Sequence, residues 1–191
     1  MKAFVLAEPG KVKWFDAPEP QLVPYGAILK PVAVTPCSSD VHTVFGGGSK
    51  KQDNLVLGHE CIAEVVSVGE NVCDFKAGDR VAVPAITPDW REKSIQEGND
   101  RHASAPFSGH QLGRTQPGVF SERFLIKDAD TTLAHIPQKI SEEQALMSVD
   151  VVTTGFTGAE YADIKIGDTV CVIGKGGSEV ESLRNELNCA E

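Results

Sequence analysis

Short apolar runs separated by proline and glycine fill the first half of the chain. Runs of this length between turn-forming residues are typical of β-strands. The pattern predicts strands at residues 3–6, 12–15, 27–30, 62–68 and 81–83, and strand alternation again from Val119 to Lys127. Pro31 and Pro36 lack a backbone N–H, so the stretch between them should bend or lie at the edge of a sheet.

Helical signals are fewer. A turn or one short helix is expected at 35–42, whereas 87–118 is long, charged and without periodicity, as in loops that are functional or cover an interface. Residues 141–144 (SEEQ) form a capping box, so a helix should begin there. It should continue to Ala162 with a break near Gly155. Three of its residues should face the core: Ala145, Leu146 and Met147.

The last segment has a different pattern. Residues 169–173 are apolar throughout and predict a buried parallel strand. A glycine-rich turn follows, and then a second capping box at 178–181 that predicts a short helix. The predicted fold is therefore mainly β with an α/β end: one β-rich domain over residues 1–150, then a linking helix and the start of an incomplete α/β domain over 151–191.

The composition narrows the classes of function. The chain has 191 residues, 41% of them hydrophobic, and a formal net charge of −9. This content favours a buried core, and the charge argues against nucleic acid and anionic membrane surfaces as partners. No apolar run has the length of a membrane span or a secretory signal, so the expected location is the cytoplasm. The five cysteines are odd in number and widely spaced, which predicts reduced thiols that are mostly buried, with one or two as ligands.

A histidine–glutamate pair offers the first candidate chemistry. His59 and Glu60 follow Gly58 and an apolar run, so both should be buried, where an unpaired charge is costly. Thiolate, imidazole and carboxylate together suit zinc, and Cys37 and Asp150 could join the pair as its ligands. Taken singly, a lone cysteine or histidine is more often a core or surface residue, and Asp150 could simply cap a helix. Spacing alone leaves both interpretations open.

Several separated motifs resemble one family. They are Pro36–Phe45 (PCSSDVHTVF), Gly58-His59-Glu60 with a turn at Gly69, Val83–Trp90 (VPAITPDW) and Asp150–Phe156 (DVVTTGF). In order and spacing they resemble the zinc-dependent medium-chain alcohol dehydrogenases, and within them the tetrameric, NADP-dependent secondary-alcohol dehydrogenases of anaerobic bacteria and protists. The resemblance implies a GroES-like β-barrel catalytic domain followed by the first strand, turn and helix of an incomplete Rossmann domain.

The same resemblance implies a metal site. Cys37, His59 and Asp150 would bind one catalytic zinc, with the aspartate in the place of a second cysteine. Glu60 would be a conditional fourth ligand that moves on and off as substrate or water comes and goes, and it would therefore also be a catalytic residue.

The implied reaction interconverts small secondary alcohols and ketones with NADP(H). Ser39 would hydrogen-bond the substrate hydroxyl and His42 would help to pass its proton to solvent, while zinc acts as the Lewis acid and hydride passes to the nicotinamide. Gly174, Gly176 and Gly177 would lie against the cofactor pyrophosphate. The implied partners are the substrate and further copies of the chain in a homotetramer.

Three departures from the family pattern qualify these expectations. The loop 87–118 contains no cysteine, so no structural zinc is expected, and His102 and His110 would be surface residues. Ala63 stands where the family has a glycine. His110 stands where close relatives have a tryptophan in the substrate pocket, and a smaller, more polar side chain there would change the preference among alcohols.

The resemblance ends at Lys175. Glu179 occupies the third glycine position of the phosphate-binding turn, so its negative charge would face the pyrophosphate. A chain truncated within the cofactor domain is the expectation, and the 191 residues alone should not oxidise alcohols. The second hypothesis is a non-catalytic zinc-binding or assembly module. A zinc-free reductase of the same superfamily is disfavoured by the complete set of ligands.

Overall fold

The structure is a computed structural model that describes residues 1–46, 54–98, 109–165 and 167–171. The chain divides into two compact units, Met1–Leu146 and Met147–Glu191. Within the described ranges, no helix is both long and apolar enough to cross a bilayer. The predicted division into domains at residue 150 stays a prediction.

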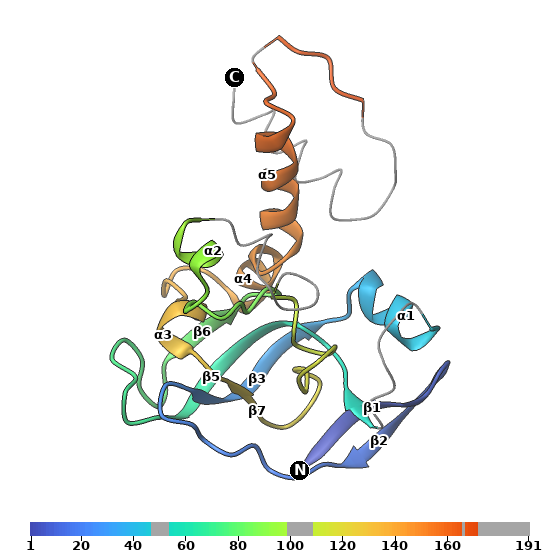
Figure 1. The fold of residues 1–191 in the computed structure, drawn as a ribbon, viewed down its shortest axis with the longest axis vertical. Coiled ribbons are helices and arrows are strands. Elements are labelled where there is room, and N and C mark those ends of the chain that lie inside the picture. The colour runs from blue at the N-terminus through green and yellow to red at the C-terminus, as the bar shows by residue number, and fades with distance from the viewer. Residues whose placement is uncertain (47–53, 99–108, 166, 172–191) are drawn as a thin grey trace. The chain divides into compact units, whose positions relative to one another are not determined.

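Two antiparallel sheets make up most of the first unit (Figure 1). The smaller has the order β2-β1-β4, from Lys11–Asp16, Lys2–Glu8 and Leu55–Val56. The larger has the order β7-β3-β5-β6-β8, from Phe124–Ile126, Ala27–Thr35, Glu60–Val68, Arg80–Val83 and Ala134–His135. All the strands predicted from the apolar runs are present in this unit, so its mainly β character is confirmed.

Strand β3 runs through Pro31, as a strand edge allows. Its partner β7 pairs only with residues 27–29, so no described strand needs the missing N–H of Pro31 on that side. On the other side, the pairing with β5 is irregular between Pro31 and Ala33. The proline therefore lies at an edge and beside a bulge, as expected.

Five helices occur among the described residues: α1 Ser38–Val44, α2 Lys93–Gln96, α3 Ala129–Thr132, α4 Glu142–Ser148 and α5 Val151–Tyr161. The capping box of α4 is confirmed, because the N–H of Ser141 donates to Gln144 Oε1 and the N–H of Gln144 donates to Ser141 Oγ. The predicted break near Gly155 is wrong, since α5 continues through that residue and the interruption falls at Asp150, where φ is −143°. Met147 was expected to face inward, but it is 49% exposed.

The predicted buried strand near the end is not formed in its described part. Thr169 and Cys171 are exposed, and residues 169–171 have no strand assignment. A parallel strand takes its hydrogen bonds from neighbouring strands, and the described part of the second unit supplies none. The glycine turn and the last helix, residues 174–191, lie outside the described ranges.

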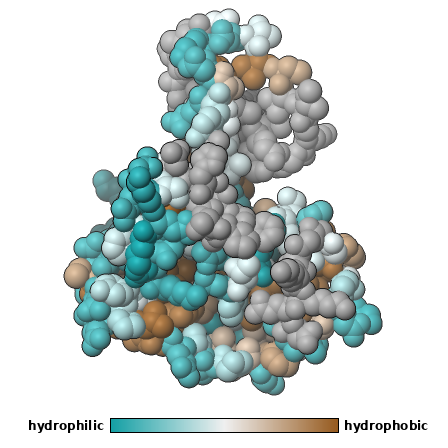
Figure 2. All heavy atoms as spheres, viewed as in Figure 1, coloured by the Kyte–Doolittle hydropathy of each residue, from teal (hydrophilic) through white to brown (hydrophobic). Residues whose placement is uncertain are grey.

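The core of the first unit lies mainly on the inner face of the larger sheet. Leu29, Ala63, Val81 and Phe124 are among its members, each at most 2% exposed. Ala63 pairs with Pro31 and Val81, so its methyl group fills core space at the position where the resemblance expects a glycine. On the visible face of this unit, hydrophobic residues form separate small groups among hydrophilic ones (Figure 2).

The four described cysteines are free thiols, but only Cys61 is fully buried. Burial raises the pKa of the Cys61 thiol, which keeps it neutral. Cys73 and Cys171 are exposed, so the expectation that most cysteines are buried is wrong.

Candidate metal centre

The turn at Gly58 brings His59 and Glu60 to the start of β5. Gly58 has φ of +89°, and a Cβ there would lie 2.4 Å from the ring of Phe120. Glycine is therefore required both by conformation and by space. His59 and Glu60 are each 2% exposed, as predicted for a buried pair.

Cys37 lies at the start of α1, and Asp40 ties it to the turn. The Asp40 carboxylate accepts the N–H of Cys37 through Oδ2 at 2.9 Å and the N–H of Gly58 through Oδ1 at 3.2 Å. The same Oδ1 lies 3.3 Å from His59 Nδ1. One carboxylate thus joins the helix start, the glycine turn and the imidazole.

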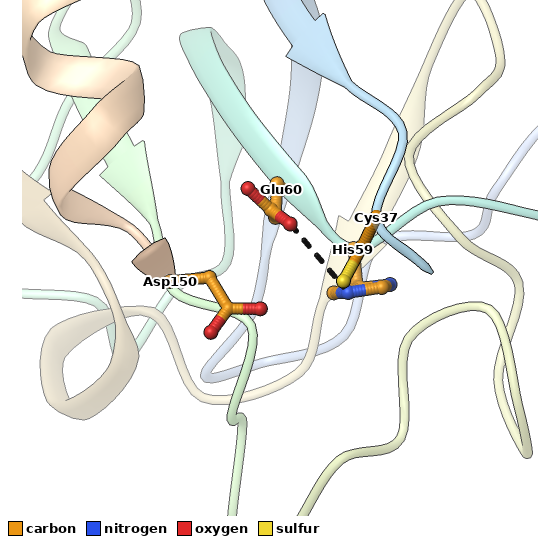
Figure 3. Close-up of side chains that lie close together, drawn as sticks. All are labelled: Cys37, His59, Glu60 and Asp150. Atoms are coloured by element: carbon orange, nitrogen blue, oxygen red, sulfur yellow. Dashed lines mark ion pairs between the residues drawn. The ribbon is translucent and has the colours of Figure 1, made fainter. Parts of the chain in front are cut away.

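The side chains of Cys37, His59 and Glu60 converge (Figure 3). One ligand atom of each lies within 4.8 Å of the others, and His59 Nε2 lies 3.9 Å from Glu60 Oε1. Zinc bonds of about 2.0–2.3 Å put two ligands of one ion at most about 4.6 Å apart. The sulfur, nitrogen and oxygen donors therefore suit zinc in their chemistry, and their spread of up to 4.8 Å exceeds this limit by only about 0.2 Å.

The electrostatics of the cluster favour the charged form of His59 and lower the pKa of the Cys37 thiol. Burial opposes the charge on His59, but hydrogen bonds and charges from Asp40 and Cys37 outweigh it and raise the pKa of His59 to about 10. The hydrogen bond with His59 lowers the pKa of Cys37, against the effect of burial. Burial would raise the pKa of Asp40, but hydrogen bonding and charge from His59 lower it. The sulfur of Cys37 is therefore suited to bind a cation. A bound cation would displace the proton of His59.

Asp40 was missed by sequence reasoning. Its signal was its place in the first turn of the helix that follows Cys37, but an aspartate there is ordinarily explained by helix capping and the helix dipole. Its contacts with Gly58 and His59 cross about twenty residues of sequence and could not be read from the pattern. In metal sites, a carboxylate on the second nitrogen of a ligating histidine fixes the tautomer and the ring orientation.

Ser39 and His42 both lie on α1. Ser39 is half-buried and its Oγ lies 3.4 Å from His59 Nε2, whereas His42 is exposed. Three residues apart on a helix, they share one face. The structure therefore puts Ser39 beside the cluster and His42 toward solvent.

The remaining predicted site residues are Asp150 and the three glycines of the expected cofactor turn. Asp150 belongs to the second unit, immediately before α5, where its Oδ1 accepts a hydrogen bond from Thr154 Oγ1 at 2.7 Å. Gly174, Gly176 and Gly177 are outside the described residues. His110 lies in the first unit with its ring against His59. It was expected to be a surface residue and to stand where close relatives have a substrate-pocket tryptophan, but its contact with His59 was not expected.

Comparison with known proteins adds a family to this geometry. Residues 24–138 match the model described as the alcohol dehydrogenase GroES-like domain. The chain is 49% identical over 176 residues to an NADP-dependent isopropanol dehydrogenase of Thermoanaerobacter brockii. The aligned residues cover 92% of this chain and 50% of the relative. The chain is 44% identical over 176 residues to the protein of the same name from Entamoeba histolytica, with 92% and 48% covered.

Solved structures show the same fold. The apo form of zinc dependent alcohol dehydrogenase 2 from Streptococcus pneumonia is similar with a TM-score of 0.71 at 29% identity, over 82% of this chain and 44% of that one. Alcohol dehydrogenase TADH from Thermus sp. ATN1 has a TM-score of 0.88 at 24% identity, over 100% and 55%.

The two sheets and the thiol–imidazole–carboxylate cluster define a β domain with a candidate metal site. The chain belongs to the alcohol dehydrogenase GroES-like domain family, because that family's model matches more than half of it. The predicted family and fold class are thereby confirmed. The chain spans about half the length of the curated relatives it matches.

Proposed function

We propose that this chain is the zinc-binding catalytic domain of an NADP-dependent secondary-alcohol dehydrogenase. The convergence of Cys37, His59 and Glu60 within 4.8 Å carries the proposal. Two of its relatives are named NADP-dependent isopropanol dehydrogenases, which supports the class of substrate and the cofactor. Zinc and NADP are general properties of this family. The more specific statement, that the chain binds one catalytic zinc and no structural zinc, is part of the proposal.

The donor set favours zinc over harder cations. Magnesium and calcium take oxygen ligands, whereas a thiolate with an imidazole and a carboxylate suits zinc. Asp150 completes the set in this proposal, with Glu60 as the conditional ligand. The position of Asp150 just before α5, with Oδ1 held by Thr154, restricts the carboxylate to few orientations. When bound, the zinc supplies a Lewis acid that lowers the pKa of an alcohol hydroxyl.

The residues of α1 provide a path for the proton of the alcohol. Ser39 Oγ, beside His59, accepts a hydrogen bond from the substrate hydroxyl and takes up its proton as its own leaves. His42 lies one turn further along the same helix and is exposed, so it exchanges that proton with solvent. Both residues act by moving a proton out of a buried site, and neither needs to touch the cofactor.

Cofactor binding and assembly are the remaining parts of the proposed function. Binding of NADP at Gly174, Gly176 and Gly177 and assembly into a homotetramer are proposals that rest on the resemblance. The free thiols of the described cysteines suit a reducing compartment such as the cytoplasm.

Metal analysis of the purified chain tests the proposal. We expect about one zinc per chain, lost in Cys37→Ala and in His59→Ala. Cys73→Ala and His135→Ala are matched controls, because both residues are exposed and outside the cluster. Stoichiometric zinc that survives both ligand substitutions would refute the ligand set. A substrate assay with propan-2-ol and NADP then tests the reaction, for which a protein as long as the relatives is the appropriate sample.

A further inference from the structure

The imidazole of His59 is in contact with a second histidine ring. The ring centroids of His59 and His110 are 4.5 Å apart and the planes meet at 66°, which is an edge-to-face contact. His59 is 2% exposed, whereas His110 is partly exposed. A partly exposed ring therefore packs against the buried imidazole of His59.

The backbone holds His110 from both sides. Before it, Gly109 has φ of +86° and its carbonyl accepts the N–H of Thr87 at 2.9 Å. After it, the carbonyl of Gln111 accepts three backbone N–H groups of the following turn, and Leu112 is 1% exposed. The backbone that carries the His110 ring is thus held on both sides by hydrogen bonds of the surrounding loop.

Polar contacts at both ring nitrogens also orient His59. Its Nδ1 lies 3.3 Å from Asp40 Oδ1 and its Nε2 lies 3.4 Å from Ser39 Oγ, and both contacts are near the long limit for hydrogen bonds. A hydrogen bond along the line of one nitrogen still allows the ring to tilt about that line. A ring packed at its face or edge removes this freedom.

We propose that His110 is a positioning residue of the metal centre, which fixes the plane of the His59 imidazole for metal binding. This inference rests on the proposed function, because that function requires the metal. His110 is not itself a ligand in the described cluster, whose atoms within 4.8 Å of one another do not include its nitrogens. Its contribution is pre-organisation: the bound state requires one ring orientation, and His110 restricts the metal-free state to it.

The expected effect is moderate. Edge-to-face ring pairs shift an equilibrium about 2- to 13-fold, and loss of groups that orient a ligating histidine weakens metal binding about 10- to 100-fold. We expect His110→Ala to weaken zinc binding about 10-fold, where these ranges meet. His110→Phe retains a ring but no nitrogen, and it should stay within about 3-fold of the unchanged chain because the ring contact is what matters.

The test measures zinc affinity by competition with a chromophoric chelator, for the unchanged chain, His110→Ala, His110→Phe and His135→Ala. The last is a matched control, since His135 also packs on an aromatic ring, that of Phe75, with centroids 4.5 Å apart and outside the cluster. Co²⁺ absorption spectra of the same proteins report the ligand geometry. Thermal melts of the metal-free proteins show whether each variant is folded.

Each outcome decides the inference. Weakened binding in His110→Ala with binding and cobalt bands retained in His110→Phe supports a positioning role. Unchanged binding in His110→Ala would overturn it. Equal losses in both variants, with altered cobalt bands, would overturn it too, because His110 would then supply a donor atom. An unchanged chain that binds no zinc would refute the proposed function itself, which a loss confined to the variants would not.

Discussion

Replacing Gly118 with alanine should displace the turn that carries His59. Backbone N–H groups of residues 118–120 donate to carbonyls of residues 56–58 at 2.9–3.0 Å. A Cβ on Gly118 would lie 2.3 Å from the carbonyl oxygens of both Leu57 and Gly58. Backbone atoms cannot rotate away as a flexible side chain can, so the two segments must separate.

The size of the separation follows from the contact. Real Cβ atoms stay at least about 3.0 Å from other heavy atoms, so the segments must open by about 0.7 Å (3.0 minus 2.3 Å). Weakening of about two backbone hydrogen bonds, at ~1 kcal/mol each, and strain of ~1–2 kcal/mol give a loss of about 2–4 kcal/mol in the free energy of unfolding. Metal sites tolerate deviations of only about 0.2 Å, so zinc affinity should fall about 10- to 100-fold.

Two assays check this prediction. Urea unfolding of the metal-free protein gives the change in stability, and chelator competition gives the zinc affinity. Gly158→Ala is the control: Gly158 lies in α5 with nothing within 4 Å of the new Cβ, and it should stabilise the helix by about 0.5–1 kcal/mol. If Gly118→Ala matched the unchanged chain in both assays, the close packing behind the metal site would be refuted.

Three further perturbations test the same account. Asp40→Asn should weaken zinc binding about 10- to 100-fold, since an amide offers one acceptor oxygen to the three groups that meet the carboxylate; wild-type affinity in this variant would contradict the role of Asp40. The pKa of His59 is raised to about 10, so zinc must displace its proton. The affinity for zinc, measured with a chelator of known pH dependence, should therefore rise about tenfold per pH unit from pH 7 to about 10. An affinity that is already constant near pH 7 would argue against a protonated His59. Arg91 binds Asp128 and stacks on aromatic rings. Arg91→Ala should therefore lower the melting temperature more than Lys93→Ala does. Equal melting temperatures would show that other contacts hold the loop that carries Arg91.

The strands were predictable because their signals are local. Apolar runs and turn residues predicted the strands of the first unit, and Pro31 of β3 behaved as an edge residue. The helix break was not predictable in this way. A glycine inside a helix costs only about 1 kcal/mol, which α5 tolerates at Gly155. The interruption falls instead at Asp150, whose backbone is not helical and whose carboxylate accepts a hydrogen bond from Thr154 Oγ1.

The metal centre was predictable in its donors and not in its supports. Residue type and motif predicted Cys37, His59 and Glu60 as donors, and the structure brings these three together. Asp40 and His110 act through contacts between segments distant in sequence, where neither periodicity nor spacing carries a signal. The buried strand expected at 169–173 failed in its described part because an apolar run specifies burial without supplying neighbours.

Anomalous X-ray diffraction at the zinc edge, from crystals of the zinc-loaded chain, tests the central claim most directly. The account predicts one anomalous peak, about 2.3 Å from Cys37 Sγ and about 2.0–2.1 Å from a nitrogen of His59, with Asp150 or Glu60 as a further ligand. A peak on other residues, or no peak at this cluster in zinc-loaded crystals, would contradict it.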